Sequence, residues 1–209
     1  TGLIRGAFEY QGQKCSAASR AYVPASLWPA VEKQLKTDLA AIKMGGTEDF
    51  ENFVNAVIDA KAFSKITSYI IEAKKSPELT VISGGNFDDS KGYFVEPTVL
   101  LTTNPTYRTM VEEIFGPVLG SVRVTNDEDA VRIANDSQYG LGAALWTRDV
   151  SKAHKIARQL RAGTVWVNTF DRSSITTPFG GFKQSGTGRD RSLHSIEGYT
   201  NLKTTWIQL

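Results

Sequence analysis

Residues 141–168, LGAALWTRDVSKAHKIARQLRAGTVWVN, carry the pattern that decides the fold class. Two short runs within this stretch, 142–146 and 163–168, are rich in small, β-branched and aromatic residues, which is typical of strands. Between them four apolar residues recur at helical spacing: Ala153, Ile156, Ala157 and Leu160. A strand, a helix and a strand in this order usually connect two parallel strands, so the stretch predicts an α/β unit.

The same alternation of strand and helix patterns extends through the rest of the chain. Further strands are predicted at 20–23, 79–82 and 121–124, and further helices from Ser26 to the Gly45–Gly46 pair, at 53–75 and at 128–135. Pro97 lies in the extended segment 92–102 and lacks a backbone donor, which predicts an edge strand or an irregular strand. We therefore expect an α/β fold with a mainly parallel, twisted sheet and helix crossovers.

Two segments depart from this alternation. Residues 170–191 are rich in Gly, Ser, Thr and Arg without an apolar period, and such long irregular segments in compact domains are usually functional. The final run, LKTTWIQL at 202–209, returns to strand composition. Because it lies apart from the crossover pattern, we expect this strand to pair with another chain.

The composition excludes several classes of protein. The chain has 209 residues, of which 41% are hydrophobic and 22% charged, and its 24 basic and 22 acidic residues are scattered. This balance gives no basic surface for nucleic acid or for an anionic membrane, and neither is expected as a partner. A single cysteine forms no internal disulfide, so we expect a reducing compartment, the cytoplasm or the mitochondrial matrix.

The single cysteine, Cys15, is by itself a weak signal, because most free cysteines are buried and inert. Its polar, glycine-containing neighbours favour an accessible thiol instead. A metal site is not expected, since the two histidines, His154 and His194, are far apart and lack ligand spacing.

Four motifs together make Cys15 a stronger candidate for a functional residue than it is by itself. They are GQKC at 12–15, GYFVEPTV at 92–99, EEIFGPVL at 112–119 and PFGGFKQSG at 178–186. In this order and at these separations they resemble the aldehyde dehydrogenase superfamily along the whole chain. The part of the chain before EEIFGPVL resembles pyrroline-5-carboxylate (glutamate semialdehyde) dehydrogenases. The part after it is more similar to aminoaldehyde or γ-glutamyl-aminobutyraldehyde dehydrogenases.

The resemblance implies an enzyme that oxidises aldehydes with NAD or NADP. Cys15 matches the nucleophile, whose thiolate adds to the aldehyde, loses hydride to the nicotinamide as a thiohemiacetal, and leaves a thioester for water to hydrolyse. Glu113 matches the carboxylate that binds the ribose next to the nicotinamide, and Phe115 matches the ring beside it.

The substrate pocket is implied by the same resemblance. Phe179 matches an aromatic wall, Ser16 a position beside the nucleophile, and Ser174 a hydroxyl that receives the substrate carboxylate. Glutamate semialdehyde is therefore the first expectation for the substrate. Arg172 would suit an acidic aldehyde and Asp171 a cationic aminoaldehyde, so an aminoaldehyde stays open as the alternative.

The same resemblance predicts the domain organisation. Residues 1–195 match the catalytic domain and 196–209 an oligomerisation segment, which implies a homo-oligomer. Motifs of the Rossmann-like cofactor domain, with its general base, do not occur in these 209 residues. We therefore expect the catalytic half of an aldehyde dehydrogenase, unable to turn over alone. A non-enzymatic module that assembles with copies of itself is the other hypothesis.

Overall fold

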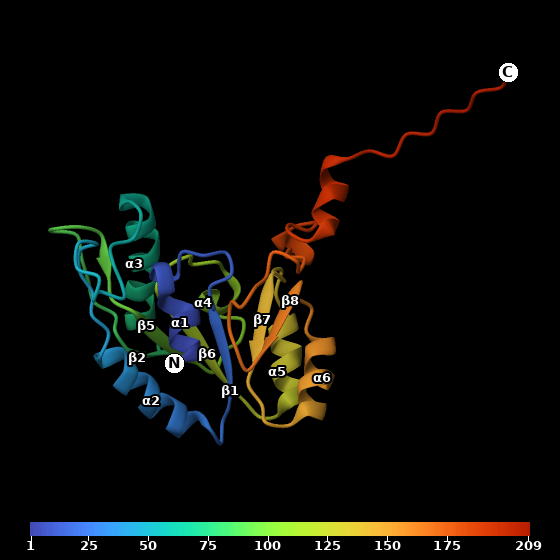
Figure 1. Cartoon of the computed structure of the whole chain (residues 1–209). Helices are drawn as coiled ribbons and strands as arrows, with labels where there is room; N and C mark the ends of the chain where they lie inside the picture. Colours follow the sequence, from blue (N-terminus) through green and yellow to red (C-terminus); the bar gives the residue numbers. More distant parts are fainter. The chain divides into compact units, whose positions relative to one another are not determined.

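The computed structural model describes all 209 residues and divides them into two compact units, residues 1–137 and 138–209, each described here by itself. The first unit is built on a four-stranded sheet, labelled in Figure 1. Its strand order is β1-β6-β5-β2, with β1 at Arg20–Pro24, β6 at Val118–Val124, β5 at Thr98–Thr102 and β2 at Leu79–Ser83. The three strands β1, β6 and β5 are parallel, and only β2 runs antiparallel to its neighbour.

The central strands of this sheet are apolar on both faces, as expected for parallel strands covered by helices. Along β5, Val99 packs in one hydrophobic cluster and the next residue, Leu100, packs in another. Because successive side chains of a strand point to opposite faces, the two clusters lie on opposite sides of the sheet. The expectation of an α/β fold with a mainly parallel sheet is confirmed.

Helices cover both of these faces. The Val99 cluster contains residues from α1 (Gly2–Phe8) and α2 (Trp28–Ala40), whereas the Leu100 cluster contains the buried face of α3 (Ala60–Lys75). Two shorter helices, α4 (Arg108–Val111) and α5 (Asp127–Asn135), precede and follow β6. A small hairpin of β3 (Phe87–Asp88) and β4 (Phe94–Val95) lies between β2 and β5 in the chain.

Three local predictions differ from the structure. The first long helix begins at Trp28, because Ser26 gives no cap, and ends at Ala40, before the glycine pair. The segment before Ala60 is not helical, because Asp59 caps the helix by accepting a hydrogen bond of 2.7 Å from the Ala62 amide. Pro97 lies between β4 and β5, so the extended segment 92–102 is interrupted there, as the irregular alternative predicted. The edge-strand alternative is wrong, because β5 is an inner strand.

The second unit contains the predicted strand–helix–strand. Strand β7 (Gly142–Leu145) pairs in parallel with β8 (Thr164–Val167), and α6 (Val150–Gln159) connects them. Asp149 caps α6 by accepting from the Lys152 amide at 3.0 Å. The following segment is irregular as predicted and contains the short 3₁₀ helices η2 (Lys183–Ser185) and η3 (Leu193–Tyr199).

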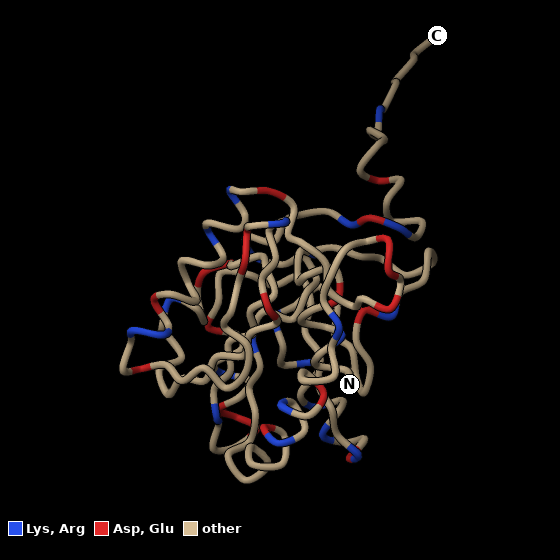
Figure 2. The backbone as a smooth tube through the Cα atoms, turned by 90° about the vertical axis from the view of Figure 1, so that its left-hand side faces the viewer, with Lys and Arg blue, Asp and Glu red and all other residues tan.

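The last ten residues, 200–209, form no helix or strand and are exposed. Figure 1 shows them extending away from η3 within the second unit. The strand predicted at 202–209 thus has no pairing partner within the chain. Figure 2 shows acidic and basic residues dispersed along the backbone, which agrees with their scatter in the sequence. No helix has the length and apolar content needed to cross a membrane.

Candidate functional site

Cys15 lies in a turn at the end of an unusual stretch of backbone. The 3₁₀ helix η1 (Glu9–Gly12) contains the left-handed residues Tyr10 (φ 53°) and Gln11 (φ 58°), followed by Gly12 (φ 65°). Left-handed backbone is strained for residues other than glycine, and such strain is often stored at functional sites. The turn then brings the Cys15 side chain to the surface, so the thiol is accessible, as its polar neighbours indicated.

Gly12 joins this turn to the EEIFGP motif. A Cβ atom at Gly12 would collide with the carbonyl oxygen of Gly116 and would lie 2.7 Å from that of Ala7. Only glycine allows the two backbones to approach so closely. The fold therefore places the cysteine turn directly against the second motif, about a hundred residues later in the chain.

Two glutamine side chains fix the turn from the other side. The Gln11 side-chain amide donates to the carbonyl of Ala56 at 3.1 Å, and the Gln13 side-chain oxygen accepts from the amide of Ile58, also at 3.1 Å. Residues 55–58 belong to no helix or strand and lead directly to the cap of α3. The residues on both sides of Gly12 are thus bonded through their side chains to one neighbouring segment.

The residue before Cys15 is engaged in an ion pair. Lys14 Nζ lies 3.1 Å from Glu9 Oε2, and Arg5 donates to the other oxygen of that carboxylate at 2.8 Å. These interactions, that of Arg5 first, lower the pKa of Glu9 below its ordinary value. Glu9 therefore stays ionised near neutral pH and orients the Lys14 side chain.

The EEIF segment presents most of its side chains to solvent. Ile114 is buried against α3, whereas Glu112, Glu113 and Phe115 are exposed, and of these three Glu112 also contacts residues of that helix. Lys65 of α3 donates to the Glu113 carbonyl oxygen at 2.7 Å. The backbone of the motif is thereby held while the two predicted cofactor-binding side chains remain free to meet a ligand.

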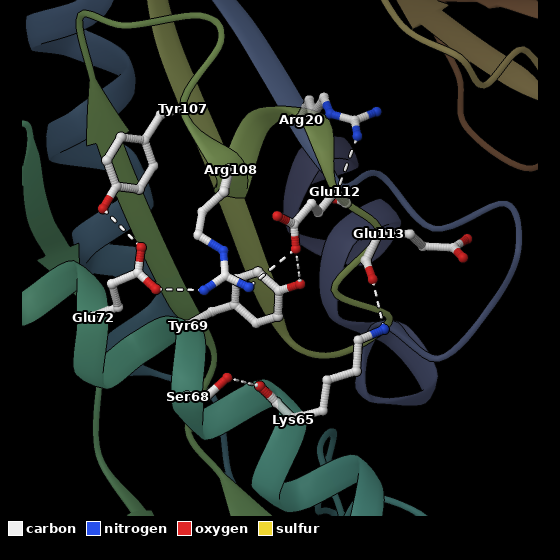
Figure 3. Close-up of polar contacts among 9 residues, drawn as sticks. All are labelled: Arg20, Lys65, Ser68, Tyr69, Glu72, Tyr107, Arg108, Glu112 and Glu113. Atoms are coloured by element: carbon white, nitrogen blue, oxygen red, sulfur yellow. Dashed lines mark hydrogen bonds and ion pairs between the residues drawn. The ribbon is translucent and has the colours of Figure 1, made fainter.

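A cluster of charged and aromatic side chains holds Glu112, as Figure 3 shows. Tyr69 donates to the Glu112 carboxylate at 2.5 Å, and Arg108 contacts the same carboxylate at 3.1 Å. The Arg108 guanidinium also pairs with Glu72 and lies 4.3 Å from the centre of the Tyr69 ring. Tyr107 donates to the other Glu72 oxygen at 3.1 Å, which adds a further side chain to the network.

The pKa values in this network follow from its hydrogen bonds. The bond from Arg108, and then that from Tyr69, lower the pKa of Glu112 below its ordinary value. Desolvation, and then the Glu112 carboxylate, raise the pKa of Tyr69. Because the pKa of Glu112 is lower in the folded chain than in the unfolded chain, its ionised carboxylate stabilises the fold. This contribution is complete at pH values above the unfolded carboxyl pKa and is lost as pH falls through the lower folded value.

In the second unit, the PFGGF motif packs on the strand–helix–strand. The Phe182 amide donates to the Gly140 carbonyl at 2.8 Å, and a Cβ atom at Gly163 would collide with the carbonyl of Gly180. Phe179 is half-buried and forms a bridge with Asp190 through two backbone hydrogen bonds of 2.9 and 2.7 Å. The predicted substrate wall is therefore fixed by its backbone.

The hydroxyl cluster before this motif forms a turn. Ser174 Oγ lies 2.8 Å from Thr176 Oγ1 and accepts from the Thr176 amide at 3.2 Å. Thr177 returns to the Ser174 carbonyl through its amide at 3.1 Å. Ser174 is exposed, but its hydroxyl already has partners in the turn, so a ligand would have to share it.

The structure thus collects the predicted residues in two groups. Cys15, Ser16, Glu113 and Phe115 belong to the first unit, where the cysteine turn and EEIFGP meet at Gly12. Ser174 and Phe179 belong to the second unit. No group of three or more acidic, His or Cys side chains is arranged to bind a metal ion.

The sequence did not reveal the residues that hold these groups. Gln11 and Gln13 are adjacent to the cysteine, but their partners lie 45 residues away. The network around Arg108 likewise joins α3 to a segment 35 or more residues later. Helical spacing of Lys65, Tyr69 and Glu72 on one side of α3 was the only local signal.

Comparison with known proteins assigns a family to this α/β chain, in which an accessible cysteine is held against a carboxylate-bearing motif. The sequence profile described as the aldehyde dehydrogenase family matches residues 1–205. Over 196 residues the chain is 47% identical to the mitochondrial delta-1-pyrroline-5-carboxylate dehydrogenase of Danio rerio, a match covering 90% of this chain and 35% of that protein. It is 41% identical over 204 residues to the NADP/NAD-dependent aldehyde dehydrogenase PuuC of Escherichia coli (strain K12), covering 98% and 41%.

The solved structures agree. An indole-3-acetaldehyde dehydrogenase in complex with NAD+ matches with a TM-score of 0.93 and 42% identity, over 100% of this chain and 42% of that one. The chain therefore belongs to the aldehyde dehydrogenase family, which confirms the resemblance read from the four motifs. It spans about two fifths or less of the length of these relatives.

Proposed function

We propose that this chain is the catalytic part of an NAD(P)-dependent aldehyde dehydrogenase, with Cys15 as the nucleophile. The observation that carries the proposal is the exposed Cys15 turn, held against the EEIFGP motif by the contact of Gly12 with Gly116. Strained backbone and two side-chain hydrogen bonds between the turn and a neighbouring segment are typical of a preorganised site. A merely structural surface cysteine would require neither.

In the proposed reaction the Cys15 thiolate attacks the aldehyde carbon, a C–S bond forms, and the carbonyl oxygen becomes an alkoxide. Backbone N–H groups of the Cys15 turn would stabilise this oxygen. Loss of hydride from the same carbon gives a thioester. Water then breaks the C–S bond, releases the carboxylate and regenerates the thiol.

The residues of the EEIF motif fit a nicotinamide dinucleotide. Glu113 presents an exposed carboxylate, which accepts hydrogen bonds from ribose hydroxyls, and Phe115 presents an exposed ring beside it. Phe115 has φ 59°, so its backbone is fixed in a conformation that non-glycine residues rarely adopt. The bound dinucleotide would supply the hydride acceptor. Lys65 and the Arg108 network would keep Glu113 in place.

The substrate that the similarity favours is glutamate semialdehyde, which would be oxidised to glutamate. The 47% identity to a protein named pyrroline-5-carboxylate dehydrogenase supports it. An aminoaldehyde is the second candidate, supported by the 41% identity to PuuC over almost the whole chain. The mitochondrial relative also fits a reducing compartment, such as the matrix, in which the thiol would stay reduced.

The proposal predicts a reactive thiol in the folded 209-residue chain. Iodoacetamide at neutral pH should label Cys15 at least as fast as a free peptide thiol, measured by intact mass, and unfolding in urea should not accelerate it. Glutamate semialdehyde should protect Cys15 at lower concentrations than an aminoaldehyde does. Cys15→Ser is the labelling control. The same chain with NAD should form no NADH, because these 209 residues contain no dinucleotide-loop motif.

Labelling that accelerates strongly on unfolding would contradict the role of Cys15 and would favour the structural module. Steady NADH formation would instead overturn the expectation that these residues do not turn over alone.

We also propose that residues 1–195 act as the catalytic domain and 196–209 as an oligomerisation segment. The support is a run of exposed apolar side chains without a partner in the chain: Leu202, Trp206, Ile207 and Leu209. Deleting 201–209 should convert an oligomer into a monomer, as measured by light scattering. An intact chain that is already a monodisperse monomer would exclude this role of the segment.

A further inference from the structure

A half-open groove in the first unit takes no part in the site proposed above. It has a volume of about 520 Å³ and lies between the end of α2 and the hairpin of β3 and β4. Its lining includes none of the residues assigned to the aldehyde or to the dinucleotide. Pockets for small molecules usually have volumes of roughly 300–1,000 Å³. The groove is therefore large enough for a small ligand of its own.

One wall of the groove is apolar and comes from the end of α2 and the residues after it. Leu39 and Ile42 line the groove and also pack in the hydrophobic cluster that contains Val99, so the core holds them in place. Met44 is 39% exposed, and its flexible thioether side chain can adapt to the shape of a ligand. This wall thus combines a fixed apolar surface with one adaptable side chain.

The second wall is one face of the hairpin. Phe94 and Glu96 flank Val95, which is buried in the cluster that contains Leu100, so both of them point to the other side and line the groove. Asp88 pairs with Phe94 across the hairpin and shares its face. This wall therefore presents an aromatic ring bordered by two carboxylates.

Hydrogen bonds to Asn86 fix the first carboxylate, that of the partly buried Glu96. The Glu96 amide donates to the Asn86 carbonyl at 2.9 Å, and Glu96 Oε2 accepts from the Asn86 amide at 3.2 Å and from its Nδ2 at 2.8 Å. Both of these side-chain bonds end on Oε2, so the other oxygen, Oε1, accepts none. A carboxylate held in this way has an oxygen ready to accept a hydrogen bond from a ligand.

The second carboxylate adds to the negative charge of the groove. Asp88 accepts from the Ser90 amide at 3.0 Å and from the Ser90 hydroxyl at 2.9 Å. These bonds lower the pKa of Asp88 below its ordinary value, with a smaller contribution from the nearby Lys91, so Asp88 is ionised near neutral pH. No Lys or Arg side chain lines the groove. The charges that border it are therefore negative.

We infer that this groove binds an organic ammonium ion with an apolar body. Glu96 Oε1 accepts a charge-assisted hydrogen bond from the ammonium group, and Asp88 adds attraction from the other strand of the hairpin. The carbon skeleton packs between Phe94 and the apolar wall at Met44, where the ring also attracts a cation. A neutral ligand of the same shape gains only the apolar contacts, and an anion is repelled by both carboxylates. The inference goes beyond the proposed function, because the groove shares no residue with the Cys15 site.

Three probes with different terminal groups test the groove in the 209-residue chain. At neutral pH 4-phenylbutylamine is a cation, 4-phenylbutan-1-ol is neutral and 4-phenylbutyrate is an anion. NMR of the labelled methionine methyl groups gives one signal for Met44 in the groove and one for Met110, which is buried and does not line it. The amine should shift the Met44 signal alone and bind about fivefold more tightly than the alcohol, as expected for one partly exposed ion pair. The butyrate should bind more weakly than the alcohol.

Two variants and a matched control assign the effect to the carboxylates. Glu96→Gln should weaken binding of the amine about fivefold and leave binding of the alcohol unchanged, because both apolar surfaces are retained. Asp88→Asn should act in the same direction, and it provides the same test if Glu96→Gln disturbs the hairpin. Asp89→Asn removes an exposed charge of the same hairpin that does not line the groove, and it should leave binding of the amine unchanged.

The inference is overturned if the amine leaves the Met44 signal in place, if the alcohol or the butyrate binds as tightly, or if Asp89→Asn weakens binding as much as Glu96→Gln. The amine should also leave iodoacetamide labelling of Cys15 unchanged. Protection of Cys15 without a shift at Met44 would place the amine in the aldehyde site instead, which equally overturns the inference. An unreactive Cys15 would contradict the proposed function and leave the result for the groove standing.

Discussion

A chain carrying Gly12→Ala should lose about 3 kcal/mol of unfolding free energy in the first unit. A left-handed φ costs an L-residue about 1–2 kcal/mol, and forcing an extra methyl into packed atoms adds about 1–3 kcal/mol. Both costs apply here, because Gly12 has φ 65° and its missing Cβ would meet the backbone carbonyls of Gly116 and Ala7. Neither carbonyl can move away as a flexible side chain could.

Urea denaturation, combined with amide exchange in β5 and β6, measures this loss in the first unit. Gly188→Ala is the control in the second unit, read from amide exchange in β7 and β8, since Gly188 has φ 76° and no atom within 4 Å of its missing Cβ. It should show only the conformational cost, about 1 kcal/mol. Equal losses for Gly12 and Gly188 would mean that the backbones of the two motifs do not meet as described. In the Gly12 variant, iodoacetamide labelling of Cys15 should also change.

Ile66→Ala should be similarly damaging, at about 3–4 kcal/mol, within the range for buried isoleucines. Ile66 is fully buried on α3 and contacts Gly116 of the EEIFGP motif. The substitution removes hydrophobic burial and leaves a cavity beneath the segment that carries Glu113. The free energy of unfolding should therefore fall while amide exchange in this segment increases.

Ile71→Ala provides the comparison on the same helix, because Ile71 is 41% exposed. It should cost less than about 1 kcal/mol. The discriminating measurement is amide exchange at 112–116, which should increase in the Ile66 variant and stay unchanged in the Ile71 variant. If both variants leave these amides equally protected, α3 does not support the motif.

Much of the fold could be predicted from local patterns. The strand–helix–strand at 142–168 appears with its order and parallel pairing, because its apolar period is regular and its ends carry strong signals. The helix that ends at Lys75 was predicted to begin too early, since Val57 and Ile58 continue its apolar pattern in the sequence. In the structure the helix begins only after Asp59, whose side chain caps it. Propensity and period do not show which of several polar residues will form the cap.

The candidate site was predicted as separate motifs rather than as an arrangement. Cys15, Glu113 and Phe179 follow from motif resemblance, but the sequence alone shows neither the contact between Gly12 and Gly116 nor the ion pairs of Arg108. Such contacts depend on long-range packing. The position of Arg191 over Phe179 similarly depends on two left-handed residues, which no local pattern indicates at an Arg-Ser pair.

The two glutamine bonds beside Cys15 have a consequence for how this surface can change. Both end on main-chain atoms, the carbonyl of Ala56 and the amide of Ile58, so the side chains at 56 and 58 take no part in them. Almost any residue at these positions offers the same two atoms, with proline at 58 as the exception because it has no N–H. The surface beside Cys15 is therefore open to redesign for new substrates or partners, while the geometry of the thiol is maintained by main-chain atoms that a side-chain substitution leaves in place.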